Sequence, residues 1–183
     1  MKRMRRVVLV SGVVLGFAAA CGGKKSSGGS TVPGGSGSIS GSVAGHPDST
    51  VAASYLIGSP DDPATTVVYA FDTPVLCSDI TAKGWDTRIT DGTQILEMKM
   101  IGQSLQTYVV ATNAVAAAGR STVNYTLSST TGTPQEVLSS GGNVVLSTRT
   151  TGVGATGTFA LSFPAGSLTG TYDAAFCAGG REP

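Results

Sequence analysis

The apolar positions along this chain form short runs separated by turn-forming residues. From residue 38 onward, runs rich in apolar and β-branched residues alternate with segments that contain Gly, Pro, Asn or Asp. Runs of this length and punctuation are typical of β-strands. The sequence therefore predicts strands over residues 38–43, 51–57, 66–71, 93–101, 105–111, 122–128 and 143–150.

The segment 93–101 alternates most clearly. Leu96, Met98 and Met100 fall on one face of a strand, whereas Glu97 and Lys99 fall on the other. Successive side chains of a strand point to opposite faces, so this pattern predicts a half-buried strand.

The C-terminal segment 156–176 is predicted to form a hairpin. Its turn is Pro164-Ala165-Gly166, because Pro is preset for the second position of a type I turn. One apolar face of this hairpin is expected to close the core. The residues of that face are Phe159, Leu161, Phe163, Leu168, Tyr172, Ala174 and Phe176.

Helical signals are brief. Residues 75–83 fit one short helical turn that carries Cys77 and ends at Gly84, and residues 114–118 fit a second short helix before Gly119. The remainder is about nine short strands with regular turns, in a composition rich in Gly, Ser and Thr. We therefore predict an all-β fold, either an antiparallel sandwich or a partly open barrel.

The first twenty residues have the pattern of an export signal. Four of the first six residues are basic, and residues 7–20 form an apolar run of fourteen. This run is shorter than the roughly twenty apolar residues that span a bilayer. A secretory signal is therefore favoured, and a membrane-spanning anchor is the alternative.

Ala18-Ala19-Ala20-Cys21 resembles the lipobox of bacterial lipoproteins, although the box prefers Leu where Ala18 stands. The resemblance implies cleavage before Cys21, a diacylglyceryl group on its sulfur and a third acyl chain on the new N-terminus. Two or three chains anchor a protein stably, since each buried CH₂ contributes about 0.8 kcal/mol. In that class an Asp after the cysteine marks inner-membrane retention. Gly22 stands there instead, which favours the outer membrane.

The organisation that follows has three parts: a signal peptide at 1–20, a lipidated cysteine with a flexible Gly/Ser tether at 21–36, and a single β domain at 37–183. Four of the twelve basic residues lie in the signal, so eight remain against eleven acidic ones, a net charge of −3. No basic cluster remains, which argues against a nucleic-acid partner.

Lipid on Cys21 leaves Cys77 and Cys177 as a pair. Two cysteines in an oxidising compartment predict a disulfide. The closed loop spans about a hundred residues, for which the chain-entropy model gives at most about 4.7 kcal/mol. A metal or redox pair is the alternative, and the wide separation without a nearby His argues against it.

Candidate catalytic and binding residues are few. His46, beside Pro47 and Asp48, is expected in a solvated turn. Asp79, Asp86 and Asp91, and the pair Asp61-Asp62, could offer oxygen ligands to calcium, but their spacing fits solvated or turn-capping aspartates better. Trp85 could stack on a sugar, although a single tryptophan in a small β domain is more often a core residue.

The ending from Gly166 to Cys177, GSLTGTYDAAFC, resembles the ending of small uncharacterised bacterial lipoproteins, a likeness that implies no activity. No catalytic or metal-site motif and no cofactor signature is recognisable. We therefore expect a non-enzymatic, lipid-anchored envelope protein that acts as a structural or interaction module. Its expected partners are the membrane, through Cys21, and an envelope protein or the cell wall. The alternatives are a carbohydrate- or calcium-binding module and, more remotely, an envelope hydrolase.

Overall fold

The computed structural model describes residues 32–48, 50–58, 64–112 and 117–183. The predicted signal peptide, Cys21 and the Asp61-Asp62 pair therefore lie outside the described residues, as does most of the predicted helix at 114–118. The described chain folds into eleven strands and two short 3-10 helices. The predicted all-β class is confirmed.

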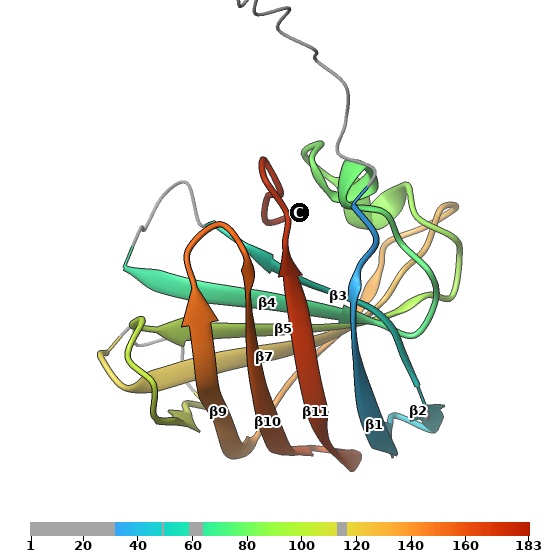
Figure 1. Ribbon diagram of the computed structural model, residues 1–183. Helices are drawn as coiled ribbons and strands as arrows, with labels where there is room; N and C mark the ends of the chain where they lie inside the picture. Colours follow the sequence, from blue (N-terminus) through green and yellow to red (C-terminus); the bar gives the residue numbers. More distant parts are fainter. Residues whose placement is uncertain (1–31, 49, 59–63, 113–116) are drawn as a thin grey trace, which may run out of the picture.

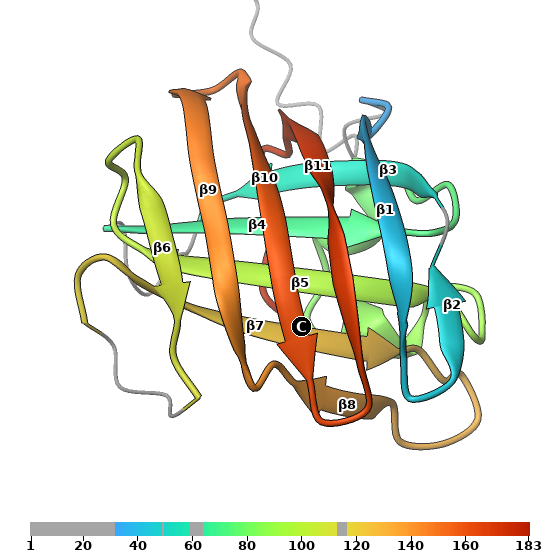
Figure 2. The ribbon, with the colours of Figure 1, turned by 90° about the horizontal axis from the view of Figure 1, so that it is seen from below.

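The strands form two layers, and the strands of one layer cross those of the other (Figure 2). The first layer holds, in spatial order, β6 (Thr107–Val110), β9 (Gly141–Thr150), β10 (Gly154–Phe163), β11 (Gly166–Phe176), β1 (Gly35–Val43) and β2 (His46–Asp48). The second layer holds β3 (Val51–Ile57), β4 (Thr65–Phe71), β5 (Gln94–Ile101), β7 (Arg120–Leu127) and β8 (Gln135–Leu138). This crossing is that of an orthogonal sandwich.

The two layers are joined along both sides. On one side β6 pairs antiparallel with β9 and parallel with β7, the latter over only two residue pairs. On the other side β11 pairs parallel with β3 over two residue pairs, and β1 pairs antiparallel with β3 across an irregularity at Gly35–Gly37. The result is a sandwich whose edges are closed by short contacts, with antiparallel pairing elsewhere.

The main core lies between the layers. The predicted hairpin is confirmed as β10 and β11, which pair from Gly154 and Ala175 to Phe163 and Gly166. Its inward face is buried as expected, except that Phe176 is only partly buried. The inward face of β5 packs against it. This core includes Leu96, Met98, Met100, Phe159, Leu161, Phe163, Leu168, Tyr172 and Ala174.

A second hydrophobic core lies on the opposite face of the β3–β4–β5 sheet. It is covered by two 3-10 helices, η1 (Cys77–Ile80) and η2 (Trp85–Thr87), and by the chain after β11 (Figure 1). Trp85 lies fully buried among Tyr69 and Phe71. Because both faces of the sheet are covered, every residue of β4 is buried.

Some local predictions differ from the structure. The short strands β2 and β8 were not predicted, and β1 begins at Gly35, inside the range 21–36 assigned to the tether. His46 is half-buried at the start of β2; the turn before it is Ala44–Gly45. Within the described part of the chain, no helix has the length and apolar character needed to cross a membrane.

Candidate functional site

The predicted disulfide is confirmed. Cys77 on η1 and Cys177 after β11 are bonded, with their Cα atoms 5.5 Å apart. Both residues are fully buried in the second core. The bond therefore fastens the 72–93 segment to the end of the C-terminal hairpin, and it has no exposed sulfur for redox exchange.

The three aspartates of the 79–91 segment lie at separate places, and two of them accept local hydrogen bonds. Asp79 Oδ2 accepts a hydrogen bond from the Leu76 amide at 2.8 Å, at the start of η1. Asp91 Oδ1 accepts one from the Thr130 amide at 2.8 Å. Asp86 lies on η2. In the described ranges no three His, Cys, Asp or Glu side chains gather closely enough to hold a metal ion.

Trp85 is a core residue, so its ring offers no surface to a sugar. It is fully buried and packs edge-on against Tyr69 and Phe71, with ring centroids 5.2 and 5.7 Å away. Its Nε1 donates a hydrogen bond to the Arg181 carbonyl oxygen at 2.8 Å. This bond holds the C-terminal segment over the second core.

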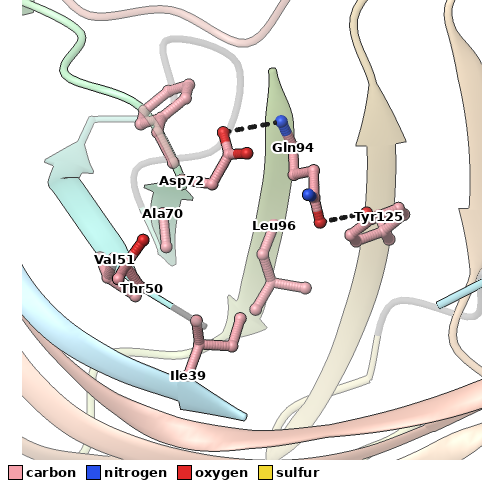
Figure 3. A pocket seen from close by; sticks show the side chains of 9 residues that line it. Ile39, Thr50, Val51, Ala70, Asp72, Gln94, Leu96 and Tyr125 are labelled. Carbon is pink, nitrogen blue, oxygen red and sulfur yellow. Dashed lines mark hydrogen bonds between the residues drawn. The ribbon is translucent and has the colours of Figure 1, made fainter. Parts of the chain in front are cut away.

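A polar cluster closes one end of the main core (Figure 3). Asp72 Oδ1 accepts a hydrogen bond from the Gln94 amide at 2.9 Å, and the Tyr125 hydroxyl donates one to Gln94 Oε1 at 2.6 Å. Burial raises the pKa of Asp72. The adjacent cavity of about 10 Å³ has room for no more than one water molecule. This arrangement seals the core and leaves no room for a substrate.

The best candidate site lies on the outer face of the second layer. There Tyr69 on β4, Glu97 on β5, Asn124 on β7 and Leu138 on β8 stand opposite one another on four neighbouring strands. Directly opposed residues of antiparallel strands have Cβ atoms about 4.5–5.5 Å apart. The row therefore sets a phenol, a carboxylate, an amide and an apolar side chain side by side.

Beside this row is a cavity of about 200 Å³, which we call the β7 slot. It lies beside the part of β7 between Ser121, where pairing with β6 ends, and Asn124, where pairing with β8 begins. Its polar lining residues are Glu97, Thr112, Thr122, Asn124 and Ser139. Its apolar lining residues are Ala111, Val123 and Leu138.

The negative charge of the Glu97 carboxylate is only partly balanced by neighbouring positive charge. Burial is the main cause that raises its pKa, followed by repulsion from Glu182 and, more weakly, Glu136. Lys99 lowers the pKa of Glu97 but gives its ammonium group to Glu182, with Nζ–Oε distances of 2.9 and 3.0 Å. Buried charges are normally paired. Glu97 is a half-buried carboxylate, and the cation that attracts it, Lys99, is also paired with Glu182.

Two further polar groups of the row are also incompletely satisfied. The Tyr69 hydroxyl approaches the Glu97 carboxylate without reaching full hydrogen-bonding geometry, and burial raises the pKa of this phenol. Asn124 Oδ1 is buried and accepts no hydrogen bond within the described structure. Groups left in this state are uncommon in folded proteins and mark either strain or a missing partner.

Other hollows on the described surface are chemically plainer. One of about 440 Å³ is lined by Asp79 and Arg88 among others, but the Asp79 carboxylate is already engaged by the η1 amide. Another of about 380 Å³ runs along glycines and threonines at the ends of β1, β10 and β11, with Asp173 as its charged residue. Neither hollow contains a buried carboxylate short of partners.

The sequence placed Glu97 correctly on the polar face of its strand but gave no sign that this face would be covered. The carboxylate that repels Glu97 most, Glu182, lies near the chain end, and β8, which was not predicted, adds Leu138 to the lining of the slot. A short strand after Pro134 and a charged residue near the C-terminus give almost no periodic signal.

The chain matches no protein-family model, and no curated protein or solved structure matches it either. The described residues form an all-β domain with two cores, a buried disulfide and a slot lined by the half-buried carboxylate of Glu97.

Proposed function

We propose that this chain is a lipid-anchored envelope protein whose domain acts as a non-catalytic interaction module. The observation that carries the proposal is the N-terminal pattern: a basic start, a fourteen-residue apolar run and Ala18-Ala19-Ala20-Cys21. Lipid on Cys21 would hold the domain at a membrane, most simply the outer membrane because Gly22 follows the cysteine.

The placement of the disulfide supports this setting. An oxidising envelope compartment allows a structural disulfide to persist, whereas a reducing cytosol does not. Cys77 and Cys177 are bonded and fully buried. They are used for stability, which leaves Cys21 as the one cysteine of the sequence available for lipid.

The distribution of reactive side chains favours an interaction role over hydrolysis. His46 is the one histidine of the sequence and sits on the short strand β2. Asp79 and Asp91 each accept a hydrogen bond from a backbone amide. A hydrolase needs a base and a nucleophile or two facing carboxylates converging on a pocket, and the described residues present no such group.

The proposal is tested by crosslinking in intact cells, with tagged wild-type protein and an unanchored Cys21→Ser control. We expect the wild type to be crosslinked reproducibly to one envelope protein or cell-wall fragment, and the control to lose most of that product. Turnover of an ester or glycoside by the purified protein, abolished by His46→Ala or Glu97→Gln, would instead establish an enzyme.

A further inference from the structure

We propose that the β7 slot binds the cationic end of a lysine or arginine side chain from a partner protein, with Glu97 as the anionic acceptor. This inference rests on the proposed interaction role, because that role supplies the partner protein. The binding chemistry of the slot is independent of where the chain is anchored.

The charge of the slot calls for a cation. Glu97 is the charged residue of the lining, and the carboxylates of Glu182 and Glu136 add negative potential nearby. Lys99 is committed to Glu182. An ammonium or guanidinium group placed beside Glu97 would form a charge-assisted hydrogen bond, which is roughly twice as strong as a neutral one.

The Glu97 carboxylate and Asn124 Oδ1 are hydrogen-bond acceptors, so a ligand that carries several donors would fit them. Among the described residues, the Tyr69 hydroxyl is the donor that approaches the Glu97 carboxylate, and Asn124 Oδ1 receives no hydrogen bond. Ammonium and guanidinium groups carry three and five N–H donors respectively and no acceptor. A metal ion fits less well, because the described residues supply no group of three suitable ligands here.

The shape of the slot suits a basic side chain attached to a polypeptide. Lysine and arginine carry an aliphatic stem that packs on apolar surface while the charged head is bound elsewhere. Leu138, which is 64% exposed, stands next to Asn124 at the rim, and Ala111 lines the slot as well. The stem would cover Leu138 while the head reaches Glu97.

The experiment is an NMR titration of the purified full chain, labelled with ¹⁵N, using n-butylammonium and n-butylguanidinium as probes. The neutral n-butanol is the matched control for the apolar stem. Saturable amide shifts are expected at Thr122, Asn124 and Ser139 with both cations, and not with the alcohol. The stronger of the two cations identifies lysine or arginine as the natural partner side chain.

Two pairs of variants test the assignment. Glu97→Gln is expected to weaken binding of the cations about tenfold or more, whereas Glu136→Gln, outside the lining, should change it much less. Leu138→Lys places a competing cation at an exposed rim position and should weaken binding relative to Leu138→Gln.

Absence of saturable shifts, equal shifts with n-butanol, or unchanged affinity in Glu97→Gln would overturn the inference. The Leu138 variants keep it falsifiable if Glu97→Gln does not fold. A negative titration would leave the proposed envelope role standing, because that role is tested by crosslinking of the anchored chain. A positive titration with no crosslinked partner would refute the envelope role and keep the slot.

Discussion

Removing the Cys77–Cys177 bond should cost a large share of the stability of the domain. The perturbation is the double variant Cys77→Ala/Cys177→Ala, which leaves no unpaired thiol in the second core. The bond joins residues separated by 100 positions. For a loop of this length the chain-entropy model gives about 4.7 kcal/mol. Native disulfides of small domains are worth about 2–5 kcal/mol when measured by removal.

The structure adds a local term to this estimate. Both cysteines are fully buried and belong to the second core, which also contains Trp85. Their loss removes packing as well as the crosslink, while residual contacts in the unfolded chain reduce the entropic part. We therefore expect a decrease of about 4 kcal/mol in the free energy of unfolding.

Equilibrium unfolding in urea measures this decrease. Far-ultraviolet circular dichroism reports the sheet, and fluorescence of Trp85, the one tryptophan of the sequence, reports the second core. Cys21→Ser is the matched control, since it removes the cysteine that takes no part in the Cys77–Cys177 bond, and it should leave the midpoint unchanged. A loss below about 1 kcal/mol in the double variant would contradict this prediction, because it would mean that the closed loop contributes little.

Three other predictions concern packing and charge. Trp85→Ala should lower the free energy of unfolding by about 3–5 kcal/mol in the same urea assay, and a loss under about 1 kcal/mol would contradict its central place. Gly170→Ala should lower the thermal midpoint strongly, because its Cβ would collide with a β1 carbonyl oxygen, whereas Gly141→Ala has open space and should be tolerated. Burial raises the pKa of Glu97 in the folded state, so the protonated carboxyl group favours folding. This contribution to stability is fully present below the unfolded pKa of 4.5 and is lost as the pH rises through the raised folded pKa. Glu97→Gln should therefore stabilise the protein near pH 7, with a gain that disappears below about pH 4; the reverse pH trend in urea titrations would contradict this.

Regular alternation made parts of the fold predictable from sequence. The strand 93–101 and the hairpin 156–176 were found because apolar residues at every second position must face one side of a sheet. Pro164 and Gly166 marked the turn. The disulfide was predicted because lipid on Cys21 leaves Cys77 and Cys177 as a pair in an oxidising compartment, and the structure confirms the bond.

The second core escaped prediction because its covering segment has no periodic pattern. Residues 72–93 contribute Val75, Cys77, Ile80, Trp85 and Ile89 from loops and short 3-10 helices, where neither a period of two nor of 3.6 applies. A signal was present in β3 and β4, whose nearly continuous apolar runs are typical of strands buried on both faces.

The slot could not be predicted for a related reason. The row Tyr69, Glu97, Asn124 and Leu138 depends on strand order and register across four strands, and each of these residues is unremarkable in its own segment. Pairing between distant strands is set by tertiary packing. The under-compensated charge of Glu97 appears only when Glu182, 85 positions later in the sequence, is brought to it.

We propose that the mature protein is held at a membrane by lipid on Cys21. The most direct test is mass spectrometry of the N-terminal peptide from protein isolated with the membrane fraction. We expect a peptide that begins at Cys21 and carries the mass of a diacylglyceryl group, with or without a third acyl chain. An unmodified peptide that begins at Met1, or a chain cleaved at another position without lipid, would contradict it.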